Sequence, residues 1–200
     1  MHTIETTLTT QAVFSDDHVK RYLLKKTWDT SLPKLAICMV APSIAAGIEL
    51  DSTTSLVLNN ASRLGFGSVA IVNLFATLGD FTLSQAEDED PENLEAIVSA
   101  AADADMVIYA PGVGKMKLQV MQLRAAQVLN ALKPYENKLR CLTSKSGKAR
   151  LQHPLSPSVR TWNIAELSLA ELLSKTKPMD VKDNPKKKGK PLVIRKEVSA

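Results

Sequence analysis

Three short apolar runs, each ending abruptly in a turn, constrain the fold of this chain more than any other feature. The runs Leu35–Val40, Val69–Val72 and Met106–Tyr109 lead directly into Ala41-Pro42-Ser43, Asn73-Leu74-Phe75 and Ala110-Pro111-Gly112. Short runs without polar residues are typical of strands that are buried on both faces of a parallel sheet. Ligands bind outside the carboxyl ends of such strands, so the three turns predict one shared pocket.

Helical patterns alternate with these strands. A fourth strand is expected over Lys138–Leu142, and helices are expected after Ser52-Thr53-Thr54, over Glu92–Ala102, before Pro134 and over about Asn163–Lys175. This alternation predicts an α/β chain, a three-layer α/β/α sandwich with a central, mainly parallel four-stranded sheet. The segment Arg21-Tyr22-Leu23-Leu24 fits a helix or a strand equally well.

Charge and patterning divide the chain into three parts. We expect a flexible N-terminal arm over residues 1–15, a single α/β domain over 16–176 and a basic C-terminal tail over 177–200. The net charge is +4, but residues 175–200 hold nine Lys/Arg and three Asp/Glu, whereas the rest holds sixteen and eighteen. Lys186, Lys187, Lys188 and Lys190 can contact nucleic-acid phosphates without sequence preference, or they only keep a solvated tail soluble.

Several function classes receive no support from the sequence. No apolar run approaches the ~20 residues that span a bilayer, and no secretory signal is visible, so we expect a cytoplasmic protein without a membrane partner. Cys38 and Cys141 lie in expected strands, which favours reduced core thiols. No Cys/His spacing fits a metal site, and we expect no cofactor.

The order of short motifs resembles a bacterial and phage family of domains of unknown function. The motifs are Arg21-Tyr22-Leu23-Leu24, Trp28, Met39, Pro42-Ser43, Asp51-Ser52-Thr53, Val72-Asn73-Leu74-Phe75-Ala76, Gly112, Cys141-Leu142-Thr143 and His153-Pro154-Leu155. They extend over about two thirds of the chain, in the order in which the family carries N-P-S, V-N-L-F-A and H-P-L.

This pattern is in turn remotely similar to the uracil-DNA glycosylase superfamily, at the strand ends only. The resemblance implies a uracil-DNA-glycosylase-like fold in which Asn73 reads the edge of a base and His153 stabilises the departing base. It also implies that Pro42, Ser43, Phe75 and Gly112 shape the binding site. An asparagine amide suits this task because it offers both an acceptor and donors.

The chain departs from that superfamily where hydrolysis needs a water-orienting Asp or Asn. Ala41 occupies this position and cannot orient water, and Pro111 replaces a Trp. Asp51 or Asp80 can supply a carboxylate from a neighbouring loop, and Asp51 is the better candidate, although it also fits a helix N-cap. Asn73 can equally be a turn residue, and His153 a structural loop residue.

Three functions follow as alternatives. The first is a DNA-glycosylase-like protein that binds or excises a nucleobase in DNA, with Asp51 and His153 as catalytic residues. The second is a non-catalytic module that binds nucleic acid or a nucleotide, which Ala41 favours. The third is a phage or mobile-element protein that binds a host protein through the acidic loop at residues 87–92.

Overall fold

The computed structural model describes residues 1–79, 90–112, 119–147 and 150–175. Its elements are β1 (Thr9–Phe14), β2 (Arg21–Thr27), β3 (Lys34–Met39), α1 (Ser52–Arg63), β4 (Ser68–Asn73), α2 (Pro91–Asp103), β5 (Met106–Tyr109), α3 (Gln119–Ala131), η3 (Lys133–Lys138), β6 (Leu139–Thr143), η4 (Pro157–Val159), β7 (Asn163–Glu166) and α4 (Leu169–Lys175). The fold is of the α/β class, and the segment from Arg21 onward is a strand.

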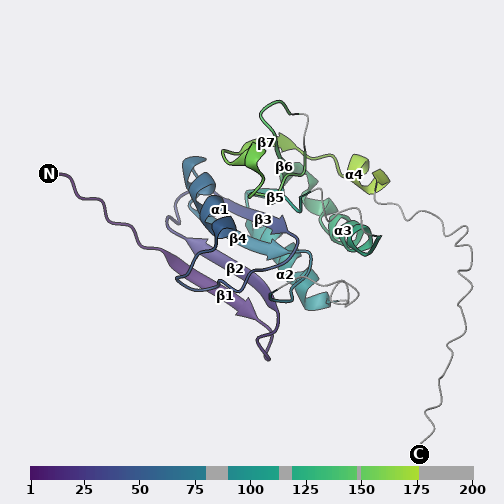
Figure 1. The fold of residues 1–200 in the computed structure, drawn as a ribbon, viewed down its shortest axis with the longest axis horizontal. Coiled ribbons are helices and arrows are strands. Elements are labelled where there is room, and N and C mark those ends of the chain that lie inside the picture. The colour runs from purple at the N-terminus through teal and green to yellow at the C-terminus, as the bar shows by residue number, and fades with distance from the viewer. Residues whose placement is uncertain (80–89, 113–118, 148–149, 176–200) are drawn as a thin grey trace, which may run out of the picture.

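Seven strands form one mixed sheet in the order β1-β2-β4-β3-β5-β6-β7 (Figure 1). The four central strands, β4, β3, β5 and β6, pair in parallel. β1 and β2 continue the sheet beyond β4 in antiparallel pairings, and β7 pairs antiparallel with β6 at the other edge. The carboxyl ends of the parallel strands therefore lie along one edge of a wider sheet.

The prediction of a mainly parallel, four-stranded sheet is wrong, because three further strands add three antiparallel pairings. β1 lies within the expected N-terminal arm, where its polar residues gave no clear strand pattern. The helix expected over Asn163–Lys175 is also wrong in its first part, since β7 pairs with β6 there and α4 begins only at Leu169. The periodicity of this short segment does not distinguish a strand from a helix. Its pairing with β6 makes it a strand.

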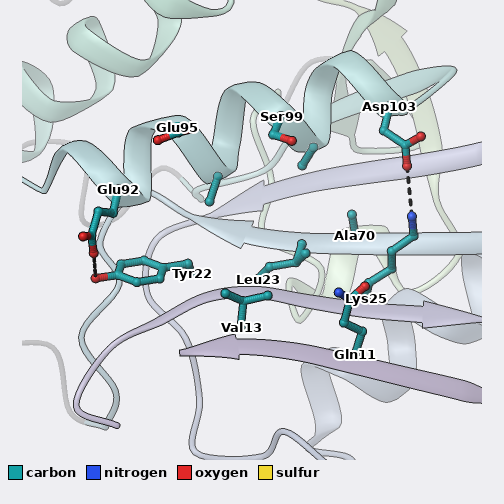
Figure 2. A pocket seen from close by; sticks show the side chains of 12 residues that line it. Gln11, Val13, Tyr22, Leu23, Lys25, Ala70, Glu92, Glu95, Ser99 and Asp103 are labelled. Atoms are coloured by element: carbon teal, nitrogen blue, oxygen red, sulfur yellow. Dashed lines mark hydrogen bonds and ion pairs between the residues drawn. The ribbon is translucent and has the colours of Figure 1, made fainter. Parts of the chain in front are cut away.

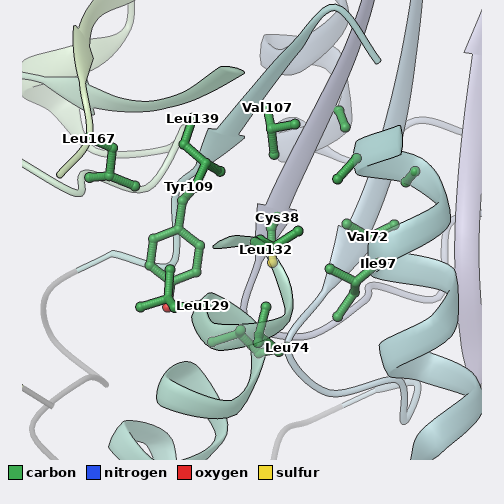
Figure 3. Packing of buried hydrophobic residues seen from close by; sticks show 14 of the residues in the cluster. Cys38, Val72, Leu74, Ile97, Val107, Tyr109, Leu129, Leu132, Leu139 and Leu167 are labelled. Carbon is green, nitrogen blue, oxygen red and sulfur yellow. The ribbon is translucent and has the colours of Figure 1, made fainter. Parts of the chain in front are cut away.

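Helices cover both faces of the sheet, as the alternation of side chains in β3 shows. Leu35 and Ile37 pack on the face that carries Val57 and Ala61 of α1. Ala36 and Cys38 point to the opposite face, where α2, α3 and α4 pack. Figure 3 shows this second core, in which Cys38 and Val72 lie near Ile97 of α2, and to which Leu129 of α3 and Leu132, just after α3, also belong. Burying such side chains stabilises a fold by about 1.5–3 kcal/mol each.

Within the described ranges, no helix is long and apolar enough to cross a membrane. The same ranges contain no group of three or more His, Cys, Asp or Glu side chains that could hold a metal ion. Both cysteines, Cys38 and Cys141, are buried free thiols. Burial raises the pKa of the Cys38 thiol to about 12, so this cysteine stays protonated at neutral pH.

Candidate functional site

Backbone hydrogen bonds hold the carboxyl ends of three parallel strands together. Met39 and Asn73 are neighbours in the register of β3 and β4. Beyond the strands, the amide of Leu74 donates to the carbonyl of Met39 at 2.9 Å, and that of Phe75 donates to the carbonyl of Val40 at 3.0 Å. The amide of Ala110, just after β5, donates to Cys38 at 2.8 Å. The three turns that follow the apolar runs in the sequence thus begin side by side.

Asn73 is the last residue of β4, and only 1% of it is exposed. It follows Ile71 by two positions, so it lies on the face of the sheet that α1 covers. Its Nδ2 atom is buried and has no hydrogen-bond partner within the described part of the chain. A buried donor without a partner costs about 1–3 kcal/mol, so a native fold retains one only for a reason.

Two side chains from the opposite face fix the backbone at Asn73. Nδ2 of Asn93, in α2, donates to the carbonyls of Asn73 at 3.0 Å and Leu74 at 3.1 Å. Nε of Arg124, in α3, donates to the same Leu74 carbonyl at 2.8 Å. Both side chains are buried. Neither residue is predictable from the sequence, because a lone Asn and a lone Arg within helices carry no signal of their partners 20 and 50 residues away.

Pro42, Ser43 and Asp51 belong to the loop that joins β3 to α1. Pro42 is buried, and the hydroxyl of Ser43 donates a short hydrogen bond to the Asp51 carboxylate. The other carboxylate oxygen accepts from the backbone amide of Thr54 at 2.6 Å, so Asp51 is the N-cap of α1. Burial alone would raise the pKa of Asp51, but the hydrogen bonds from Ser43 and Thr54 outweigh it and lower the pKa. Asp51 is therefore ionised at neutral pH, with both oxygens engaged.

Two buried cations of β2 hold this loop in place. Arg21, which is 3% exposed, donates through one guanidinium nitrogen to the carbonyls of Ser43 at 3.1 Å and Ala45 at 2.5 Å. Lys26, which is 1% exposed, donates to the carbonyl of Gly47. Burial lowers the pKa of both groups. The sequence does not predict either of them as a site residue, because a basic residue in a short strand is expected to face solvent.

Gly112 and His153 meet, although they are far apart in the sequence. Gly112 follows β5 with a φ of +77°, and a Cβ atom placed on it would lie 3.1 Å from the His153 Cβ. Nδ1 of His153 accepts from the backbone amide of Leu155 at 3.2 Å. A neutral imidazole that accepts at Nδ1 carries its proton on Nε2, so Nε2 is a donor.

The other candidate residues from the sequence differ in their burial or lie outside the described residues. Phe75 is 4% exposed and packs within the core beneath α2 and α3, away from the face of Asn73. Ala41 is half-buried and Pro111 is buried. Asp80, residues 87–89 of the acidic loop and the tail residues Lys186, Lys187, Lys188 and Lys190 lie outside the described residues.

Comparison with known proteins places this chain in a family. The family model described as "Protein of unknown function (DUF1643)" matches residues 21–155, about two thirds of the chain. The chain therefore belongs to this family, which confirms the expected membership of a domain family of unknown function. No curated protein matches the chain, and no solved structure matches it.

Proposed function

We propose that the chain binds a nucleobase of DNA at the carboxyl ends of β3, β4 and β5, and that it does so without hydrolysing the glycosidic bond. The observation that carries this proposal is the Asn73 amide, whose buried Nδ2 has no partner among the described residues. A ligand that accepts a hydrogen bond from Nδ2 would remove the cost of burying it. A pyrimidine edge offers both donors and acceptors to an amide of this kind.

The rigidity of the strand end supports this assignment. Asn93 and Arg124 hold the carbonyls of Asn73 and Leu74, so the backbone that carries the amide is fixed before any ligand arrives. A preorganised donor binds more tightly, because less conformational freedom is lost on binding. The remote similarity of the strand-end motifs to uracil-DNA glycosylases points to the same role for Asn73.

His153 completes the proposed site from the side of β5. Its contact with Gly112 brings it to the end of this strand, and its Nε2 is a donor in the neutral state. In the bound complex we assign Nε2 a hydrogen bond to an exocyclic oxygen of the base. In a glycosylase the same donor would stabilise negative charge on a departing base.

Two features favour binding over hydrolysis. Ala41 stands where the glycosylase pattern carries a water-orienting Asp or Asn, and its methyl group cannot orient water. Asp51 supplies a carboxylate in the loop between β3 and α1, but its two oxygens already accept hydrogen bonds from Ser43 and Thr54. Base excision remains the second candidate function, because Asp51 is ionised and sits in the loop that follows β3.

A paired assay tests the proposal. Fluorescence anisotropy would measure binding to single- and double-stranded oligonucleotides that contain normal, deaminated or modified pyrimidines, and alkaline cleavage would report abasic sites in the same samples. Asn73→Ala should lower the affinity for the preferred base by about tenfold, the loss of one or two hydrogen bonds. Asn59→Ala is the matched control, because Asn59 is an exposed residue of α1.

Each outcome of this assay decides something. Base-dependent binding that Asn73→Ala weakens by about tenfold and Asn59→Ala leaves unchanged, without base release, supports the proposal. Abasic sites formed by the unmodified chain would establish excision in place of simple binding. If abasic sites arise only with Ala41→Asn, the site is that of a glycosylase that has lost its water-orienting group. The absence of base-dependent binding would refute a nucleobase site and favour a protein partner.

A further inference from the structure

A groove of about 410 Å³ runs along α2, on the opposite face of the sheet from Asn73. It is lined by Gln11, Val13, Tyr22, Leu23, Lys25, Ala70, Glu92, Glu95, Ala96, Ser99, Ala100 and Asp103. We call it the α2 groove. β1 and β2 extend the sheet past α2 here, and Val13 at the floor is 39% exposed. The groove therefore opens to solvent.

The α2 groove has an apolar floor and an acidic wall. Figure 2 shows Val13, Leu23 and Ala70 at the floor, with Glu95 and Ser99 on the helix above them. The wall residues Glu92, Glu95, Ser99 and Asp103 recur every three or four positions, so they form one stripe along the helix.

Hydrogen bonds close the two ends of the α2 groove. At one end, the hydroxyl of Tyr22 donates to Glu92 at 2.6 Å, which raises the pKa of Tyr22 to about 12. At the other end, Lys25 pairs with Asp103 at 2.9 Å. Asp103 also pairs with Lys34, which lies outside the lining, at 2.7 Å, so the excess of negative charge in the groove lies at Glu92 and Glu95. An occupant that fits this lining is an apolar segment flanked by basic residues.

The chain itself contains such a segment beyond α4. Leu192-Val193-Ile194 is a short apolar run with Lys190 before it and Arg195-Lys196 after it. We propose that residues 190–196 of the same molecule dock in the α2 groove, with the apolar run on its floor and the basic residues at Glu95 and Glu92. This inference is independent of the proposed nucleobase site, because it concerns the other face of the sheet.

The length of chain beyond α4 is sufficient for this docking. α4, α3 and α2 pack on the same face of the sheet, and neighbouring helices lie about 8–10 Å apart. The path from α4 across α3 and α2 to the groove is therefore on the order of 30 Å. Sixteen residues lie between Lys175 and Leu192, and the seventeen steps from one to the other span up to about 56 Å when extended.

Paramagnetic relaxation measured by NMR on the full chain tests the docking. Cys38 and Cys141 are fully buried, so a nitroxide reagent labels an introduced surface cysteine selectively. Ala102→Cys places the label on α2 beside the groove without lining it, and Ser62→Cys places it on α1 as a control. We expect the label at position 102 to broaden the resonances of residues 190–196, and the label at position 62 to leave them sharp.

A charge reversal tests the acidic wall. Glu95→Lys should reduce the broadening about fivefold, whereas Glu49→Lys, an exposed carboxylate on the loop before α1, should leave it unchanged. Equal broadening from positions 102 and 62, or none from either, would overturn the proposal. Broadening in a mixture of isotope-labelled and nitroxide-labelled molecules would also overturn it, since the occupant would then be the tail of a second copy.

Discussion

Asn60 and Asn73 are buried asparagines of similar exposure, 4% and 1%, and we predict that truncating them has very different effects on stability. Asn60 lies in α1 and joins it to the segment before β7. Its Nδ2 donates to the carbonyl of Arg160 at 3.0 Å, and its Oδ1 accepts from the backbone amide of Trp162 at 3.0 Å. Asn73 offers a contrast, because its Nδ2 has no partner in the described ranges.

The magnitudes follow from these contacts. Asn60→Ala removes two hydrogen bonds between elements about one hundred residues apart and leaves the amide of Trp162 without a partner. At about 0.5–1.5 kcal/mol for each bond, with a further penalty of about 1–3 kcal/mol for a stranded buried group, the loss is about 2–6 kcal/mol. Asn73→Ala creates a cavity of similar size but leaves no partner of Nδ2 behind, so we expect a loss of about 1 kcal/mol or less.

Urea unfolding of the two variants beside the unmodified chain measures this difference. Both variants make the same chemical truncation, so the difference between their free energies of unfolding isolates the hydrogen bonds. Unchanged m-values would show that the variants alter stability rather than the compactness of either state. If Asn73→Ala destabilises the chain as much as Asn60→Ala does, the Asn73 amide contributes to the fold, and its assignment to a ligand fails.

Two further predictions concern the rest of the candidate site. Gly112→Ala should lower the free energy of unfolding by about 1–2 kcal/mol, because Gly112 has a left-handed backbone, and should weaken nucleobase binding, because the new Cβ displaces His153. Gly147 is the control, since its φ is +71° and the space around it is open. Gly147→Ala should lower stability in the unfolding assay and leave binding unchanged in the anisotropy assay. The pKa of Asp51 is lower in the folded chain than in the unfolded chain, so its stabilisation is present above about pH 4 and is lost as the pH falls through the folded-state pKa. Asp51→Asn keeps an N-cap and should flatten this acid limb of the stability profile, whereas an unchanged limb would show that other carboxylates dominate it.

The parallel strands were predictable because burial on both faces leaves an unbroken apolar run. The runs at Leu35, Val69 and Met106 coincide closely with β3, β4 and β5. The antiparallel strands carry no such signal. β2 contains Arg21 and Lys26, whose charges are buried against loop carbonyls, so its sequence looks polar although both side chains lie inside. Hydrogen bonds to distant parts of the chain make these segments strands, and the periodicity of the sequence contains no sign of such bonds.

The candidate site was predictable to a similar degree. Strand ends are visible in a sequence, and Asn73, the last residue of β4, and Gly112, which follows β5, lie at the expected edge of the sheet. The contact of Gly112 with His153 was not visible, because nothing local to either residue encodes it. The burial of Phe75 on the opposite face was also not visible, since the chain bends after β4 and the alternation of the strand no longer holds.

The arrangement around Asn73 separates two properties that usually occur together in a buried asparagine. In Asn60 the amide both fixes the local structure and satisfies its own hydrogen bonds, so its side chain is fully explained by the fold. At Asn73, Asn93 and Arg124 fix the strand end through the backbone carbonyls, and Nδ2 of the Asn73 amide has no partner among the described residues. A position that is held rigidly by its neighbours, yet bears a polar atom without a partner among the described residues, suits a preorganised ligand contact, and for this reason we propose Asn73, and not Asn60, as the ligand contact.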